Sequence, residues 1–149
     1  MELFAVGFLV LIATAAFMGV VVGAIGGAAA WRLRSNLVVG FVLTVCAFFL
    51  VLVADQPGDF IWLRAKLTWG VPPMSMTFLV SSVFARWLET RTTLRPNWIA
   101  LAALGVSLST GFLCLLLFRI SPGAPLLAAL GADLCLVLLV MWNRRPVRT

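Results

Sequence analysis

The sequence predicts an all-α, polytopic membrane protein, a single domain over residues 1–149 built as a bundle of five transmembrane helices. Three observations predict this fold class. The chain is 63% hydrophobic and only 11% charged, whereas a soluble domain is about 25% charged. Apolar runs of about the length that crosses a bilayer recur along the chain. The basic residues between these runs alternate from one side to the other, which sets the N-terminus outside and the C-terminus in the cytoplasm.

Five apolar runs have lengths near the roughly 20 residues that a helix needs to cross the hydrocarbon. We expect spans at about Leu3–Trp31, Leu37–Ala54, Leu67–Ala85, Ile99–Phe118 and Pro125–Trp142. The first run is long, and we expect it to tilt or to extend into the interface. Turn residues separate the runs, such as the Ser121-Pro122-Gly123 sequence between the fourth and the fifth.

The third span is the least regular, because Pro72 and Pro73 interrupt it near its start. Proline is tolerated in the first turn of a helix, where its missing N–H has no partner to lose. We therefore expect a span that continues past the prolines, with a kink at its entry. The alternative is a re-entrant loop, which would place the segment 55–97 outside and remove the charge bias. The preceding segment Asp59–Lys66 mixes apolar and basic residues, which is typical of a short interfacial helix.

The basic residues determine the predicted orientation. One side holds Arg32, Arg34, Arg86, Arg91, Arg95, Arg144, Arg145 and Arg148, and the other holds Arg64, Lys66 and Arg119. The positive-inside rule assigns the richer side to the cytoplasm. Glu2, with no basic residue before the first span, agrees with an outside N-terminus and argues against a cleaved signal peptide. The ten arginines against one lysine suggest a bacterium, and we expect its inner (cytoplasmic) membrane.

Composition excludes several function classes. The chain has no histidine, which rules out histidine-ligated haem, histidine-containing metal sites and Ser–His or Cys–His catalysis. Glycine-rich Gly23–Gly27 lies inside an apolar run and lacks the Lys-Ser/Thr of a phosphate-binding loop. We therefore expect no catalytic residues, no cofactor and no metal. A lipid-modifying enzyme is the version of an enzyme that survives these exclusions.

Net charge, tryptophan and cysteine have simple explanations in this fold class. The net charge of +6 and the pI near 11.1 come from basic residues scattered in short connections, so we expect no nucleic-acid partner. The six tryptophans fall near predicted membrane borders, as in an aromatic belt. Cys46, Cys114 and Cys135 lie in apolar runs without C-x-x-C spacing, and we interpret them as packing residues.

Small residues recur at four-residue spacing on two predicted helices. The first span carries Ala15, Gly19, Gly23 and Gly27, and the fourth carries Ala103, Ser107 and Gly111. Such faces let helix backbones approach closely in lipid. The glycine face of the first span either packs within the bundle or forms a seam with another subunit or another copy. We also expect the fourth and fifth spans to interlock as a tight hairpin.

Asp133 is the one acidic residue inside an apolar run. A carboxylate at the middle of a membrane helix costs about 2.5–3.5 kcal/mol on insertion scales, so such a residue is a candidate functional site. A hairpin turning near Pro122 would bring Asp133 level with Thr110 and Gly111. The expected coupling or hydrogen-bond site consists of Asp133, Thr110, Ser107, Thr77 and Thr44. The alternative is that these hydroxyls bond back to carbonyls of their own helices.

Three roles for Asp133 stay open: a neutral peg between helices, a coupling site that gains and loses a proton, and a salt bridge to another protein. We predict a non-enzymatic, small integral membrane subunit that packs against or regulates a larger membrane complex through its glycine-rich first helix. The alternative is a homo-oligomeric transporter or channel, coupled to protons or cations through Asp133. An odd number of spans forbids two equal inverted halves. The expected partners are the lipid bilayer, other membrane subunits or further copies of the chain.

Overall fold

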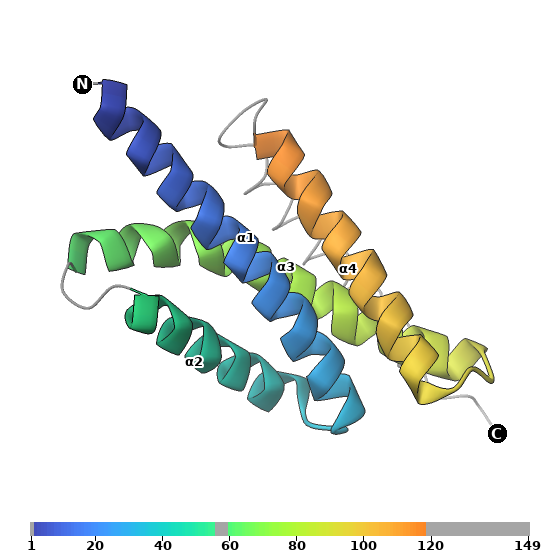
Figure 1. Ribbon diagram of the computed structural model, residues 1–149. Coiled ribbons are helices and arrows are strands. Elements are labelled where there is room, and N and C mark those ends of the chain that lie inside the picture. The colour runs from blue at the N-terminus through green and yellow to red at the C-terminus, as the bar shows by residue number, and fades with distance from the viewer. Residues whose placement is uncertain (1, 56–59, 119–149) are drawn as a thin grey trace.

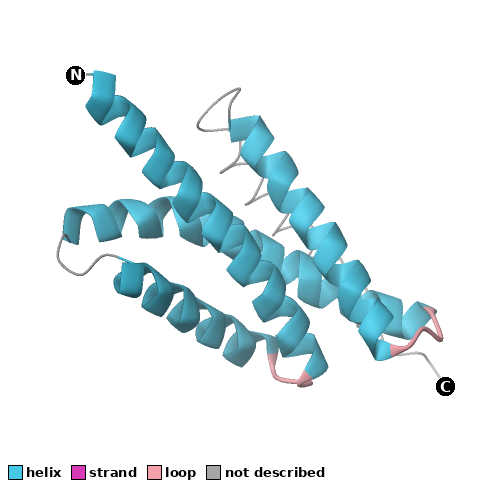
Figure 2. Ribbon diagram, viewed as in Figure 1, coloured by secondary structure: helices cyan, strands magenta, loops and turns pink. Residues whose placement is uncertain are grey.

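The computed structural model describes residues 2–55 and 60–118, and each of its elements there is an α-helix (Figure 1). The helices are α1 (Glu2–Arg32), α2 (Leu37–Asp55), α3 (Phe60–Arg91) and α4 (Pro96–Phe118). Short loops join α1 to α2 and α3 to α4 (Figure 2). The prediction of an all-helical fold is confirmed for these residues. The predicted fifth span, Pro125–Trp142, lies outside them.

Three helices are long and apolar enough to cross a membrane, which agrees with the predicted membrane fold. They are Val6–Arg32 of α1, Leu37–Ala54 of α2 and Pro96–Leu113 of α4. Helix α3 is not among them, because two prolines and a row of serine and threonine residues lower the hydropathy of its middle. The described residues thus support three spans and not the predicted number of five.

Helix α3 begins earlier than expected. It runs without interruption for 32 residues from Phe60, so the expected interfacial helix Asp59–Lys66 is not a separate element. Pro72 and Pro73 lie inside α3 and not in its first turn. Proline removes an intrahelical hydrogen bond and bends a helix, and the two halves of α3 run in different directions (Figure 1). Lys66, expected at the surface, is almost fully buried in this helix.

Helices α1 and α3 run side by side in the same direction, and α2 and α4 run back along them (Figure 1). Helix α1 contacts the other three helices, and its contact with α3 is the most extensive in the described bundle. Helices α2 and α4 contact α1 and α3 but, in the described residues, not each other. The pair α1–α3 is therefore the centre of the bundle, flanked by α2 and α4.

Two apolar clusters hold the flanking helices to this centre. Phe48 and Leu52 of α2 pack on Met74 of α3. At the other end, Trp31 and Ala85 form a cluster with two residues of α4, Ile99 and Ala103. Burying a large apolar side chain contributes about 1.5–3 kcal/mol in water, but in lipid the gain comes from close packing.

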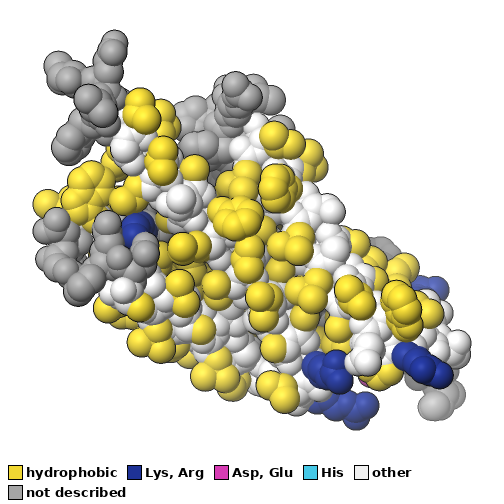
Figure 3. Space-filling view, viewed as in Figure 1, with side chains coloured by type: hydrophobic (Ala, Val, Ile, Leu, Met, Phe, Trp, Pro, Cys, Tyr) yellow, Lys and Arg dark blue, Asp and Glu magenta, His cyan; other side chains and the backbone are white. Residues whose placement is uncertain are grey.

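Large apolar side chains also cover the outside of the bundle (Figure 3). On α2 they include Val42, Leu43 and Leu50, and on α4 they include Leu101 and Phe112. Such a surface suits lipid as the solvent and not water. Cys46 is free and exposed on the same side of α2, so it is not a packing residue inside the described bundle.

Candidate functional site

The glycine face of α1 lies against α3. A Cβ atom added to Gly19 would overlap the carbonyl oxygen of Gly70, one on Gly23 that of Met74, and one on Gly27 that of Phe78. The partner residue advances by four whenever the glycine advances by four. Two parallel helices in contact along one face produce this register, because residues four apart lie one above the other. We call this contact the glycine seam.

The glycine seam is filled by backbone from within the chain. Ala15 continues it at 1% exposure, and its carbonyl oxygen lies 3.0 Å from the place of a Cβ on Gly70. The sequence leaves open whether the glycine face packs within the bundle or against another subunit or copy. In the described structure it packs within the bundle. The sequence did not indicate α3 as the partner, because α3 carries a single glycine, Gly70, at the contact.

The small residues of α4 point to the same centre. Ala103 and Ser107 are 0% exposed, and a Cβ on Gly111 would overlap Val20 of α1 and lie 3.0 Å from Cγ2 of Thr77. Gly111 thus lets α4 approach α1 and α3 together. The predicted interlocking of α4 with the fifth span concerns residues outside the described ones.

Thr77 is the centre of this three-helix contact. Its side chain is 0% exposed and lies beside Gly23 of α1 and Gly111 of α4. Thr44 of α2 lies instead against Gly26, on a neighbouring part of α1. The structure therefore brings Thr77 and Gly111 together, while Thr44 belongs to the contact between α1 and α2.

The hydroxyls of the expected site donate hydrogen bonds to carbonyls of their own helices. The distances are 2.8 Å from Thr44 to Gly40, 2.8 Å from Thr77 to Pro73, 3.0 Å from Ser107 to Leu104 and 2.7 Å from Thr110 to Val106. These bonds match the back-bonding alternative. Asp133 lies outside the described residues, so its grouping with these hydroxyls stays a prediction.

Ser81 differs from these hydroxyls. Its side chain is 0% exposed, and its Cβ packs against Gly27 of α1. Its Oγ has no hydrogen-bond partner in the described structure. A buried polar group without a partner costs about 1–3 kcal/mol. Its neighbour Ser82 is equally buried but donates to the Leu79 carbonyl at 3.2 Å.

We expect Ser81→Ala to raise the free energy of unfolding by about 1 kcal/mol, because alanine keeps the Cβ that packs on α1 and removes the unpaired hydroxyl. Thermal unfolding of the full chain in mild detergent measures the change. Ser82→Ala is the matched control and is expected to be neutral or slightly destabilising. A loss of stability in Ser81→Ala larger than that in Ser82→Ala would contradict the prediction.

Arginines of α1, of α3 and of the loops that follow these helices lie at one end of the bundle, which we call the basic end (Figure 3): Arg32, Arg34, Arg86, Arg91 and Arg95. Arg32 Nη1 of α1 donates to Asn97 Oδ1 of α4 at 2.9 Å. Arg86 Nη2 of α3 donates to the carbonyl of Ser35 in the α1–α2 connection at 3.2 Å. The first bond joins the beginning of α4 to the end of α1, and the second joins α3 to the α1–α2 connection.

Glu89 is the acid of the basic end. Its Oε2 accepts a hydrogen bond from Trp31 Nε1 at 2.9 Å, and its Oε1 lies 3.9 Å from Arg34 Nη2. Trp31 is 7% exposed and packs on α3 and α4, so it belongs to the core and not to the expected aromatic belt. In the sequence, the feature that indicates the bond between Trp31 and Glu89 is one acid between two arginines, Arg86 and Arg91.

The described residues contain no group of three His, Cys, Asp or Glu side chains that would suit a metal ion. Comparison of the chain with protein-family models, with curated proteins and with solved structures finds no match.

Proposed function

We propose that the protein is a non-enzymatic integral membrane subunit that packs against or regulates a larger membrane complex. The observation that carries the proposal is the use of the small and hydroxylated residues for internal packing. The glycines of α1 lie on α3 carbonyls, and the hydroxyls beside them bond to their own helices. A transport path needs polar groups that face water or substrate, and these groups face neighbouring helices.

The glycine seam bears on the expectation that a partner binds at the first helix. Because α3 occupies the glycine face of α1, a partner at that face would have to displace α3. The outward sides of α2 and α4 are covered by exposed apolar side chains such as Leu43, Leu50 and Phe112. We therefore assign the partner contact to these flanking helices and the glycine seam to the internal rigidity of the subunit.

We further propose five spans, with the N-terminus outside and the C-terminus in the cytoplasm of a bacterial cell. Five arginines at the basic end, against Arg64 and Lys66 toward the beginning of α3, support this orientation under the positive-inside rule. The hydrogen bond between Arg32 and Asn97 argues against a re-entrant α3, which would put them on opposite sides.

Helix α3 crosses, in this proposal, as an inner helix. Its polar residues Thr77, Ser81 and Ser82 are each 0% exposed, so α1, α2 and α4 shield them from lipid. A helix that is enclosed by other helices needs less hydropathy than one that faces hydrocarbon on all sides. In this proposal, the enclosure explains how α3 crosses the membrane although its hydropathy is lower than that of α1, α2 and α4.

Purification of the full chain in mild detergent, followed by mass measurement of the intact complex, tests the subunit proposal. We expect a different membrane protein in fixed stoichiometry with the chain. A complex that contains only copies of this chain would contradict the proposal and favour the transporter.

Substitutions of Asp133 separate the subunit from the transporter. We expect Asp133→Asn to leave the purified complex unchanged, because asparagine keeps a hydrogen-bonding side chain of the same size. Asp133→Leu removes that capacity and is expected to weaken assembly. If Asp133 instead couples transport, Asp133→Asn abolishes pH-dependent ion flux in liposomes that hold the reconstituted wild type. Flux in wild-type liposomes that disappears in Asp133→Asn would overturn the subunit proposal.

A further inference from the structure

The basic end carries more positive charge than its described residues neutralise. Its described residues include five arginines, Arg32, Arg34, Arg86, Arg91 and Arg95, and one acid, Glu89, a difference of +4. Glu89 already accepts from Trp31 and lies near Arg34. The excess charge therefore has to be balanced from outside the described chain.

The five arginines divide into two groups by what their guanidinium groups contact. Arg32 and Arg86 donate to protein oxygens, and Arg34 lies beside Glu89. The side chains of Arg91 and Arg95 are exposed, and within the described residues neither guanidinium group forms a hydrogen bond or an ion pair. Arg91 is the last residue of α3, and Arg95 directly precedes α4. Their donors are thus available to a ligand.

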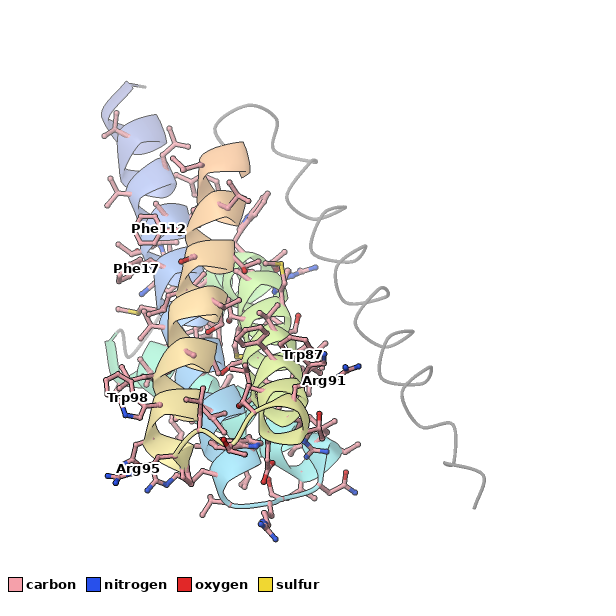
Figure 4. The ribbon with its side chains drawn as sticks, turned by 90° about the vertical axis from the view of Figure 1, so that its right-hand side faces the viewer. Phe17, Trp87, Arg91, Arg95, Trp98 and Phe112 are labelled. Carbon is pink, nitrogen blue, oxygen red and sulfur yellow. The ribbon has the colours of Figure 1, made fainter. Side chains whose placement is uncertain are left out.

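Each of these two arginines has an exposed tryptophan nearby. Trp87 lies one turn before Arg91 on the same face of α3, is 41% exposed and stacks on Phe84 with ring centroids 5.8 Å apart. Trp98 lies in the first turn of α4, three residues after Arg95, and is 63% exposed. Figure 4 shows both pairs at the same end of the bundle.

Tryptophan side chains at the end of a membrane helix lie at the depth of the lipid headgroups. With α3 crossing the membrane as proposed above, on which this inference rests, Trp87 and Trp98 place the neighbouring guanidinium groups at the level of the phosphates. Arginine presents a planar set of donors that matches phosphate oxygens. Basic clusters next to transmembrane helices bind anionic lipid for this reason.

We propose that Arg91 and Arg95, with Trp87 and Trp98 beside them, form a surface that binds the headgroups of anionic phospholipids. The lipid phosphates supply the negative charge that the basic end lacks. The hydrogen bond of Arg32 ties the beginning of α4 to the end of α1, and that of Arg86 ties α3 to the connection that follows α1. Both arginine–tryptophan pairs are thus anchored near the same end of α1. This surface does not depend on the identity of any protein partner.

Spin-labelled lipids test the proposal on the full chain reconstituted in phosphatidylcholine vesicles. The measured quantity is the association of spin-labelled phosphatidylglycerol relative to spin-labelled phosphatidylcholine. We expect wild type to prefer phosphatidylglycerol and to lose that preference as salt is raised. Each basic residue near an anionic surface contributes roughly a fivefold factor, so Arg91→Gln/Arg95→Gln should lower the preference by up to roughly 25-fold.

Arg64→Gln is the matched control, because Arg64 is an exposed arginine on the first half of α3, away from the basic end. It should keep the wild-type preference. The Arg95 carbonyl accepts hydrogen bonds from Trp98 and Ile99 at the beginning of α4, and glutamine keeps these backbone bonds. An unchanged thermal unfolding curve checks that the double variant is folded. A wild type without preference, or a double variant with the preference of Arg64→Gln, would overturn the proposal. Competition by soluble glycerol phosphate at equal concentration would show a site for free phosphate and also overturn it.

Discussion

Gly23→Ala is expected to lower the free energy of unfolding by about 1–3 kcal/mol, the usual range for overpacking a filled contact. The new methyl group would overlap the Met74 carbonyl oxygen and the Thr77 hydroxyl. A backbone oxygen cannot rotate away, so α1 and α3 have to separate along the glycine seam. Unfolding of the purified chain in mixed detergent micelles measures the loss.

Gly105→Ala is the matched control for this experiment. Gly105 lies in α4 with no atom within 4 Å of an added Cβ in the described structure. Alanine relieves the conformational entropy cost of a helical glycine, which is about 0.5–1 kcal/mol. We therefore expect Gly105→Ala to be neutral or stabilising. Equal losses in Gly105→Ala and Gly23→Ala would show that the seam has no special tightness.

Gly26 differs from Gly23 because a side chain, and not a backbone carbonyl, lies opposite it. The three atoms nearest to a Cβ at Gly26 all belong to the side chain of Thr44, which a second substitution can shorten. Thr44→Ala in the Gly26→Ala background should restore part of the stability, because it removes the Oγ1 and Cγ2 atoms that the new methyl group would overlap and leaves only the Cβ at 3.0 Å. No side-chain substitution removes the carbonyl opposite Gly23, so the two glycines should differ in whether they can be rescued.

The four-residue spacing of Ala15, Gly19, Gly23 and Gly27 predicts a close helix contact but not its partner. The spacing is a property of one helix, whereas the choice of α3 depends on the shape of both surfaces. On α3 the matching feature is carbonyl oxygen exposed at Gly70 and after it, and backbone oxygen leaves no mark in the sequence. The same limit applies to Gly111, whose neighbours Val20 and Thr77 come from two other helices.

Side-chain burial was harder to predict than helix content. Trp31 and Lys66 carry polar groups near predicted membrane borders, and both were expected at the surface. Both are almost fully buried, because α3 begins at Phe60 and extends past both borders expected for it. The apolar runs predicted helices α1, α2 and α4 to within a few residues, since a long run of apolar residues ends where its turn residues begin.

Loss of the hydrogen bond between Trp31 and Glu89 is the second large effect that we expect on stability. Glu89→Leu is expected to lower the free energy of unfolding by about 1.5 kcal/mol, the lower end of the range for a hydrogen bond to a charged group, because the Glu89 side chain is 48% exposed. The indole N–H would be left without an acceptor in a core of Ala85, Ile99 and Ala103. The ion pair with Arg34 contributes little to this loss, because the Arg34 side chain is 89% exposed and surface pairs are weak.

A double-mutant cycle isolates this hydrogen bond from other effects of the substitution. Trp31→Phe keeps an aromatic ring in the core but has no N–H to satisfy. In the Trp31→Phe background, Glu89→Leu should cost much less than it does in wild type. Glu89→Gln keeps an acceptor oxygen for Trp31 and should retain most of the stability. If Glu89→Leu cost the same with phenylalanine as with tryptophan at position 31, the loss would come from charge and not from this bond. The indole of Trp31 would then be held in the core by packing alone.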